Sequence, residues 1–323
     1  MVSLIATLPD IQKGLDSVEQ FMLRQVDDYH PDLKTATSLI LSSGGKRIRP
    51  RLSLLVGSML NADFDRLVTL ATAIEMLHTA TLVHDDLIDG SLIRRGIATL
   101  NSKWSPAATV LTGDFLFASA SEIASQTNSV KVMQIFARTL MTIVNGEVEQ
   151  LFSARNISTI EEYHLRIYAK TASLFETSTQ TAAVISNVEN HQVEKLRKFG
   201  YELGMAFQIV DDILDYIGDA STVGKPVGGD LRQGLITLPV IYFAQLYPSD
   251  TIVRKLGNLS QPLNSEETEF LISAIANSDA IHRSQDDAAK FARRAENCLM
   301  EFPSSPEKDE LLSITRFIIV RDK

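Results

Sequence analysis

The sequence predicts an all-α protein, and three observations support that fold class. Apolar residues recur three or four positions apart along most of the 323 residues, which is the spacing of helices that bury one face. Alternating β-branched segments between turn dipeptides, the pattern of strands, are nearly absent. The 16 glycines and 10 prolines are too few for a collagen-like or low-complexity chain. We therefore expect one helical domain over residues 1–323.

Prolines and glycines set the expected helix boundaries. Pro31 and Pro50 begin helices, because the missing N–H of proline has no partner in a first helical turn, and Gly90 ends one. In chain order, the expected helices span 8–26, 31–43, from 50 onward, 63–89, 106–126, 129–152, 159–187 and 192–217. Residues 218–234 are the main irregular stretch. Three shorter helices follow Pro248, with breaks near Pro262, Asn277 and Pro303.

Composition excludes several classes of protein. Forty acidic residues against 31 basic ones leave a net charge of -9, which disfavours a nucleic-acid binder because such a protein needs a basic face. The single cysteine, Cys298, cannot close an internal disulfide, which favours a reducing compartment. No apolar run approaches the roughly 18 residues of a transmembrane helix. We expect a soluble, cytoplasmic protein with no transmembrane segment.

Two aspartate clusters stand where helices disfavour them. Asp85 and Asp89 lie four positions apart at the end of one expected helix, and Asp211 begins the same pattern near the end of another. Like charges at this spacing repel by about 0.2–0.5 kcal/mol, and the helix dipole adds to the cost at a C-terminus. One such cluster is usually a solvated face. Two clusters on apolar helices call for a cation, and aspartate oxygens suit Mg2+.

Basic residues flank both clusters. Three cations follow the double glycine of GGKRIRP, Arg94 and Arg95 follow the first cluster, and Lys225 follows the second. Each of them taken singly is best explained as surface charge. Gathered around two carboxylate clusters in an acidic protein, they indicate binding of diphosphates, whose oxygens match the arginine fork.

Seven segments together carry a family resemblance. The order GGKRIRP, HTATLVHDDLIDGSLIRRG, GDFLFA, GEVEQL, YAKTASLF, GMAFQIVDDILDYIGD and GKPVGGDLRQGLITLP resembles that of the trans-polyprenyl diphosphate synthases. The match covers about residues 35–245, and the closing 321–323 also looks like that family's C-terminus. The resemblance implies an all-α barrel of about ten core helices around a deep central cavity. It also implies a homodimer, with a small partner subunit as an alternative.

The resemblance implies roles for individual residues. Asp85, Asp89 and Asp211 would ligate about three Mg2+ ions on the allylic diphosphate, with Asp86, Asp212 and Asp215 in support. Arg94, Lys170 and Lys225 would hold the same diphosphate, and Lys46, Arg49, His78 and Arg95 would hold isopentenyl diphosphate. Thr171 and Gln208 would face the reacting allyl group. His78 could instead be a core histidine, and Leu174, Phe175 and Phe207 are expected to be core.

The implied reaction joins isopentenyl diphosphate to farnesyl or geranylgeranyl diphosphate in cycles of ionisation, condensation and elimination. We expect it to depend strictly on Mg2+. One departure is that Gln233-Gly234-Leu235 stands where many members have an acid, glycine and lysine, so one cation is missing. We interpret this as a subfamily feature, which leaves Lys225 and the metal with more of the leaving-group charge.

Product length can be estimated along the first aspartate helix. At about 1.5 Å per residue, Thr81 and Ala80 lie roughly 6–8 Å from Asp85, Leu77 about 12 Å and Ile74 about 16 Å. Ala80, Thr81 and the neighbouring Ala124 are small, and Phe136 is a candidate floor. These residues predict a product of thirty carbons or more, with a twenty-carbon geranylgeranyl diphosphate synthase as the alternative. Small residues that only permit close packing would give the same pattern.

Other functions remain open at this point. A terpene cyclase usually replaces the second aspartate cluster and does not need the GGKRIRP anion site. A silent regulatory subunit tends to lose aspartates or the paired arginines, and all are present here. The catalytic half of a hetero-oligomer remains an alternative, and an apolar product implies transient membrane contact for its release.

Overall fold

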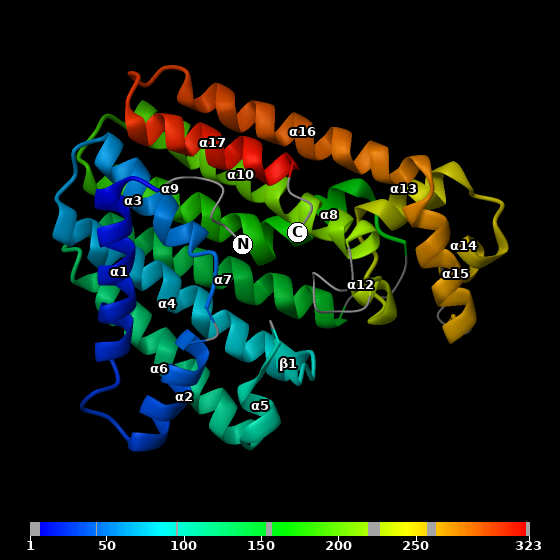
Figure 1. The fold of residues 1–323 in the computed structure, drawn as a ribbon, viewed down its shortest axis with the longest axis horizontal. Helices are drawn as coiled ribbons and strands as arrows, with labels where there is room; N and C mark the ends of the chain where they lie inside the picture. Colours follow the sequence, from blue (N-terminus) through cyan, green and yellow to red (C-terminus); the bar gives the residue numbers. More distant parts are fainter. Residues whose placement is uncertain are drawn as a thin grey trace. The chain divides into compact units, whose positions relative to one another are not determined.

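The computed structural model describes residues 7–42, 44–94, 96–152, 157–218, 227–256 and 263–320. Regular structure in these ranges is almost entirely helical (Figure 1), which confirms the predicted fold class. The exception is a two-residue antiparallel pair, β1 (Ile93–Arg94) and β2 (Ile97–Ala98), with Ile93 opposite Ala98. Gly96 within this hairpin has φ +77°, a left-handed conformation that glycine adopts without steric cost.

The chain packs as two compact units. The first contains Met1–Thr139, Leu174–Arg197 and Glu301–Ser313, and the second contains Leu140–Ser173, Lys198–Met300 and Ile314–Lys323. Both units are helical. The single domain and the central cavity expected from the resemblance stay predictions.

Helix α4 (Phe64–Ile88) is the central helix of the first unit. It packs along α6 (Pro106–Ser125), α3 (Ile48–Met59) and α1 (Pro9–Arg24) (Figure 1). Most of its residues between Leu67 and Ala80 are buried, so it lacks the solvent-facing polar side of a surface helix. By length and composition α4 could cross a membrane, contrary to our expectation that no segment would qualify, but 78% of its apolar window is buried in protein. That burial is typical of a core helix.

The ends of α4 follow the sequence prediction. Asp63 caps its start, because the carboxylate accepts the backbone N–H of Arg66 at 2.9 Å. Arg66 in turn donates to the carbonyls of Thr127 and Ile185, which lie just after α6 and at the end of α9 (Ser173–Ile185). Gly90, with φ +62°, ends the helix just after the first aspartate cluster.

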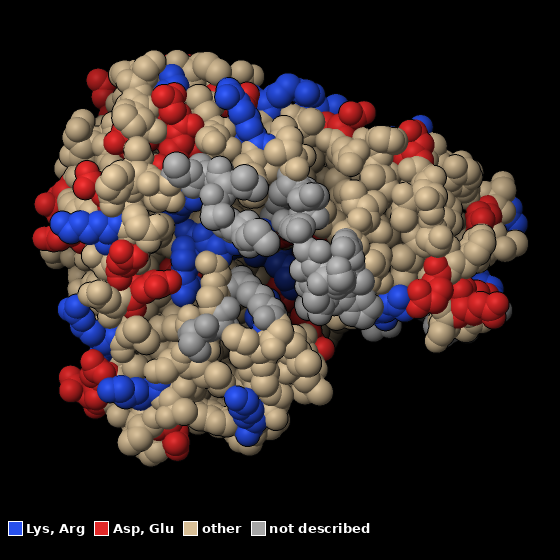
Figure 2. All heavy atoms as spheres, viewed as in Figure 1, with Lys and Arg blue, Asp and Glu red and all other residues tan. Residues whose placement is uncertain are grey.

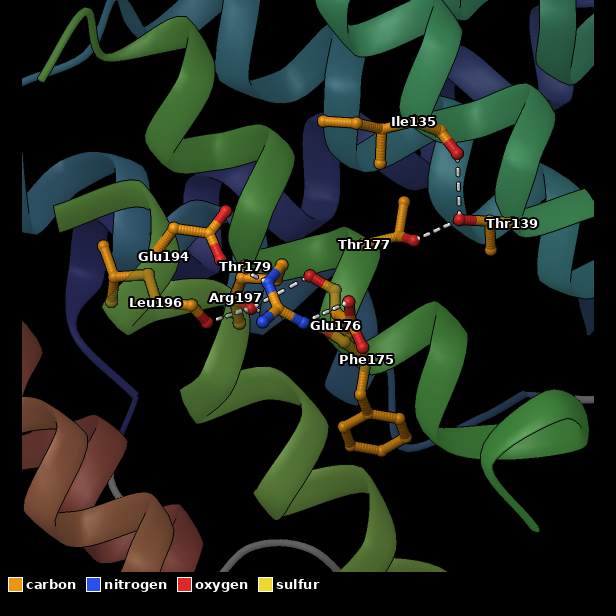
Figure 3. A network of polar contacts seen from close by, with 9 residues as sticks. All are labelled: Ile135, Thr139, Phe175, Glu176, Thr177, Thr179, Glu194, Leu196 and Arg197. Carbon is orange, nitrogen blue, oxygen red and sulfur yellow. Dashed lines mark hydrogen bonds and ion pairs between the residues drawn. The ribbon is translucent and has the colours of Figure 1, made fainter. Parts of the chain in front are cut away.

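A polar network fixes α9 in the first unit (Figure 3). Arg197 on α10 (Asn190–Ile217) bridges Glu176 and Glu194, and the Thr179 hydroxyl donates to the carbonyl of Leu196 at 2.6 Å. Thr177 shares a buried hydrogen bond with Thr139 of α7 (Val130–Phe152). Because these contacts join α9 to both neighbours, they help to fix the position of Phe175 on that helix.

The second unit contains α8 (Ile160–Ile167), the π-helical turn η1 (Tyr168–Ala172) and the later part of α10. The remaining elements are α12 (Gly229–Arg232), α13 (Leu238–Leu246), α14 (Thr251–Leu256), α15 (Ser265–Ala276), α16 (Asp279–Leu299) and the end of α17 (Pro306–Val320). Helix α13 packs along α16 and also contacts α8 and α15. At the α14–α15 end, acidic and basic side chains lie together (Figure 2), where Arg232 pairs with Glu269 and Lys255 with Glu267.

Some boundaries differ from the prediction. The single helix expected over 159–187 is three segments, because η1 interrupts it. Four helices rather than three follow Pro248 in the described residues, α12 lies within the stretch predicted to be irregular, and α13 was not predicted. Helix α3 begins at Ile48 and not at Pro50, since a proline within the first turn lacks only an N–H that would have no intrahelical partner. Short helices (α2, Pro31–Ser42; α5, Leu100–Lys103) complete the first unit.

Candidate active site

The first aspartate cluster ends α4 in the first unit. Asp85 is half-buried and Asp89 is exposed. Asp86 between them is buried, and its Oδ1 accepts a hydrogen bond from Arg94 Nε on β1 at 2.8 Å. Its backbone carbonyl accepts from the Asn101 amide at 3.2 Å. Asp86 therefore anchors the hairpin that carries Arg94, whereas the outer carboxylates of the cluster are accessible to solvent and ligands.

A glycine lets α6 approach this cluster closely. A Cβ on Gly113, from the GDFLFA segment, would lie 2.2 Å from Nε2 of His84, the residue before Asp85. The His84 ring also packs against Phe117, at 5.2 Å between centroids. Gly113 thus supports the predicted motif by leaving room for His84.

Two of the expected isopentenyl diphosphate residues, Arg49 and His78, are in contact in the first unit. Arg49 Nη1 donates to His78 Nε2 at 3.1 Å, and its guanidinium lies 4.8 Å from the centroid of the Phe175 ring. Lys46, three residues earlier, is exposed. The structure thus joins Arg49 and His78, and it gives Phe175, which we expected only in the core, a second contact. Stacking on an aromatic face orients the planar guanidinium.

The second aspartate cluster lies on α10 in the second unit. Asp212 is buried, and its two oxygens accept hydrogen bonds from Tyr163 Oη and Gln208 Nε2, both at 2.7 Å. Gln208 Oε1 in turn accepts from Thr171 Oγ1 at 2.6 Å. Thr171 and Gln208, both expected to face the allyl group, are therefore in direct contact. Burial, with Asp230 adding to it, raises the pKa of Asp212 to about 8.

Asp215 holds the chain that follows α10. Its Oδ1 and Oδ2 accept the backbone N–H groups of Gly229 and Asp230, both at 3.0 Å, at the start of α12. A carboxylate that accepts backbone N–H groups in this way caps a helix start. Asp215 therefore anchors α12, while Asp211 is half-buried.

Lys170 sits in the π-helical turn. Its Nζ lies 3.0 Å from Oε1 of Glu147, on α7 in the GEVEQL segment. Gly146 allows the close approach, because a Cβ at that position would lie 2.5 Å from Ala169 Cβ. A π turn inserts one residue into a helix and is frequent at functional sites. Here it joins Lys170 to α7 while Thr171 contacts α10.

The expected chain-length residues lie in the first unit. Ile74, Leu77, Ala80, Ala124 and Phe136 are buried, and Thr81 is half-buried. A tail channel and close helix packing both require burial, so their role in product length stays a prediction. Arg95, Lys225 and the closing 321–323 lie outside the described residues.

Sequence reasoning missed three residues that support the site: Tyr163, Glu147 and Asn101. Of these, only Glu147 carried a sequence indication, its place in a motif with no assigned chemistry. Tyr163 and Asn101 follow no pattern that points to an aspartate 49 or 15 positions away.

The carboxylates fit Mg2+ shared with a ligand better than a closed metal site. Within the ranges that the structure describes, no three His, Cys, Asp or Glu side chains converge to hold an ion by themselves. Mg2+ is commonly bound by one or two carboxylates together with water and substrate phosphates. Half-buried Asp85 and Asp211 and exposed Asp89 suit that mode, whereas both oxygens of Asp212 already accept hydrogen bonds.

Known proteins share both sequence and structure with this chain. Residues 30–275 match the family described as Polyprenyl synthetase. Heptaprenyl diphosphate synthase component 2 from Bacillus subtilis is 34% identical over 95% of this chain and 88% of its own length. Octaprenyl diphosphate synthase from Haemophilus influenzae is 33% identical over 97% of this chain and 94% of its own.

Among solved structures, heptaprenyl diphosphate synthase from Staphylococcus aureus matches with a TM-score of 0.92 and 34% identity, covering 98% of this chain and all of its own. A polyprenyl synthase from Caulobacter crescentus, complexed with calcium and isoprenyl diphosphate, matches with a TM-score of 0.89 and 33% identity over 97% and 96%. Motif order, helical fold and these likenesses agree. The chain belongs to the polyprenyl synthetase family.

Proposed function

We propose that this protein is a long-chain trans-polyprenyl diphosphate synthase, which extends an allylic diphosphate with isopentenyl diphosphate. The observation that carries the proposal is the presence of two DDxxD clusters together with a separate basic site at Arg49 and His78 that would bind a second diphosphate. A chain that joins two diphosphates needs sites for both. A cyclase acts on one diphosphate and does not need this basic site for a second one.

The chemistry divides between metal and protein. Enzymes of this family use Mg2+, which when bound supplies positive charge for the departing diphosphate, and about three ions would be held through Asp85, Asp89 and Asp211. Arg94 and Lys170 would bind the same diphosphate, and Lys46, Arg49 and His78 would bind that of the second substrate. Thr171 holds the Gln208 side chain through their hydrogen bond, and this pair would present a weak amide dipole to the allyl group.

Relatives and residues both support a long product. The similar proteins include heptaprenyl and octaprenyl diphosphate synthases, whose names imply 35 and 40 carbons. Buried Ala80 lies on α4 between Asp85 and Leu77, where a bulky ring would block an extended tail. Ala80→Phe should shorten the product to fifteen or twenty carbons with ionisation preserved. An unchanged product distribution would mean that the tail does not pass Ala80.

The decisive experiment incubates the purified chain with farnesyl diphosphate, labelled isopentenyl diphosphate and Mg2+, followed by chromatography of the dephosphorylated products. We expect linear products of thirty carbons or more. A twenty-carbon product would establish the geranylgeranyl alternative, and a cyclic hydrocarbon would establish a cyclase. No product from the folded chain alone would point to a required partner subunit.

We further propose a homodimer that uses α7. A stripe of apolar side chains is exposed on this helix, at Met141, Val144, Val148, Leu151 and Phe152. Such an exposed stripe is typical of an interaction surface. Val144→Glu and Val148→Glu should dissociate the dimer in analytical ultracentrifugation. The name of one relative, component 2, makes a heteromer with a small subunit the alternative.

A buried cysteine and a buried apolar helix bear on the cellular location. The lone Cys298 is buried, and the apolar helix α4 is mostly covered by protein. We therefore propose a cytoplasmic enzyme whose long apolar product requires transient membrane contact for release. Flotation with liposomes, with and without product, tests that contact.

A further inference from the structure

We infer that Arg47 and Glu75 form a positioning pair for the isopentenyl diphosphate site. They hold the GGKRIRP segment on α4 so that the neighbouring Lys46 and Arg49 are preorganised for the second diphosphate. Neither residue is assigned to substrate in the proposal above. The inference rests on the proposed function, because it assigns the pair to one substrate of that reaction.

The Arg47 side chain joins three helices. Its Nη1 donates to Glu75 Oε1 on α4 at 2.8 Å, its Nε donates to Glu19 Oε1 on α1 at 3.1 Å, and its Nη2 donates to the Leu41 carbonyl on α2 at 3.4 Å. The Arg47 side chain is only 13% exposed and that of Glu75 only 5%. A guanidinium with three acceptors from three elements is fixed in position and has little freedom to follow a ligand.

The backbone at Arg47 also requires support. Arg47 has φ +45° and ψ +35°, the left-handed conformation, immediately before α3 begins at Ile48. A long side chain such as that of arginine is uncommon in that conformation, so Arg47 needs support from its surroundings to hold it. The hydrogen bonds of Arg47 hold this backbone conformation at a position between Lys46 and Arg49. They therefore set the directions in which the Lys46 and Arg49 side chains extend from the backbone.

Two arginines, Arg47 and Arg49, contact the same face of α4. Glu75 accepts from Arg47, and His78, one turn further along α4, contacts Arg49. Residues three apart on a helix are neighbours on its surface, so the segment is held at two adjacent points. The buried carboxylate of Glu75 also neutralises the charge of Arg47. Arg47 is therefore a structural residue, whereas Lys46 and Arg49 carry the positive charge proposed to bind the diphosphate.

Helix α3 provides a matched control. Arg51, one turn after Arg47, forms a buried ion pair with Glu310 of α17, at 2.7 Å between Nε and Oε1. The side chains of both are at most 6% exposed. The two pairs share chemistry and burial, and only the Arg47–Glu75 pair adjoins Lys46 and Arg49 through the neighbours of both partners, Arg47 in the chain and Glu75 beside His78 on α4.

The experiment measures KM for each substrate in Glu75→Gln and Arg47→Asn. Asparagine is chosen because it tolerates the left-handed backbone. We expect KM for isopentenyl diphosphate to rise about tenfold, equivalent to about 1.4 kcal/mol, with kcat and the allylic KM unchanged. Because the two residues act as one unit, the double variant should be no worse than either single one. Arg47→Lys keeps the positive charge and loses the forked guanidinium, so its KM for isopentenyl diphosphate should rise less.

The controls separate positioning from general loosening. Arg51→Gln and Glu310→Gln should lower the melting temperature and leave KM for isopentenyl diphosphate unchanged; an equal rise in KM would overturn the inference. A lower KM in Glu75→Gln would also overturn it, since Arg47 would then be a direct ligand released by the change. If Glu75→Gln does not fold, Glu19→Gln, which changes the exposed partner of Arg47, should show a smaller rise in KM for isopentenyl diphosphate. If that KM did not rise in Glu19→Gln or in Arg47→Lys, the positioning role of the pair would be wrong.

The same assays distinguish this inference from the proposed function. Lys46→Ala and Arg49→Ala should raise KM for isopentenyl diphosphate directly. If these two variants leave that KM unchanged, the assignment of Lys46 and Arg49 to the isopentenyl diphosphate site is wrong. If they do while Glu75→Gln and Arg47→Asn behave as wild type, the site stands and the positioning pair alone is wrong.

Discussion

The two aspartate clusters share one spacing but are supported in different ways. In the first, the inner Asp86 pairs with a cation, Arg94, on a short hairpin. In the second, the inner Asp212 is held by two neutral donors, Tyr163 and Gln208. A cation offsets the charge of a carboxylate, whereas neutral donors leave most of its desolvation cost in place, which explains why burial raises the pKa of Asp212 to about 8.

The last aspartates differ as well. Asp89 is exposed at the end of α4, while both oxygens of Asp215 accept backbone N–H groups from α12. The first cluster therefore ends in an accessible carboxylate, and the second ends in one that organises the following chain. An identical DDxxD pattern thus predicts the chemistry of a site, but not which of its carboxylates are structural.

The largest expected effect is on turnover. Asp85→Ala and Asp211→Ala should each lower kcat by about 100-fold or more, since each removes a carboxylate proposed to act on the leaving group. Helical circular dichroism should not change. If only one variant lost activity, the two clusters would not be chemically equivalent, and the comparison would hold for structure alone.

Two glycines that allow close helix packing, Gly146 and Gly113, should come next in size. Gly146→Ala forces a Cβ against Ala169 of the π turn, where backbone must move, and should cost about 1–3 kcal/mol in urea unfolding. Gly113→Ala meets the ring of His84, which can rotate away, and should cost less stability. Equal losses would show that the His84 ring is as tightly held as the π turn.

Tyr163→Phe tests the neutral support of Asp212. Removal of this single donor should lower the free energy of unfolding by about 0.5–1.5 kcal/mol. Arg94→Gln replaces the cation beside buried Asp86 with a neutral donor, so it should lower the free energy of unfolding by about 1–3 kcal/mol. A smaller loss in Arg94→Gln than in Tyr163→Phe would show that the cation is not the stronger support and would contradict the comparison.

Local sequence patterns predicted much of this structure because local forces determine those parts. Asp63 and Gly90 define α4 through a cap and a left-handed residue, both readable from neighbouring positions. The π turn at Lys170 was missed because its residues fit an ordinary helix equally well. It depends on the approach of Gly146, a tertiary contact.

The site followed the same division. Arg49, His78, Thr171 and Gln208 were predicted and are found in contact in two pairs. Tyr163 was not, because its partner lies 49 positions away and no local pattern links the two. The use of Asp215 as a cap likewise depends on where α12 begins.

The smallest expected effect is a pH dependence around the second cluster. His164 follows Tyr163 on α8, with its Nε2 buried without a hydrogen-bond partner and its ring 5.4 Å from that of Phe291. Burial lowers the pKa of His164 below its usual 6.5, and Arg294 acts in the same direction, against Asp287 and Glu161.

Protonation of His164 therefore favours the unfolded chain. Between the lowered pKa and 6.5 the unfolded state binds more protons at this histidine, so its contribution to stability rises with pH and is lost as pH falls below about 6.5. The raised pKa of buried Asp212 acts in the opposite direction over the same range, because there the folded state binds more protons. The His164 contribution is therefore the free energy of urea unfolding of the wild type minus that of His164→Gln, which cannot be protonated, both measured without Mg2+. This difference should be lower at pH 5.5 than at pH 7.5, by at most about 1.4 kcal/mol for each unit of pKa shift. If it were the same at both pH values, titration elsewhere would be responsible, and His164 would not distinguish the second cluster from the first.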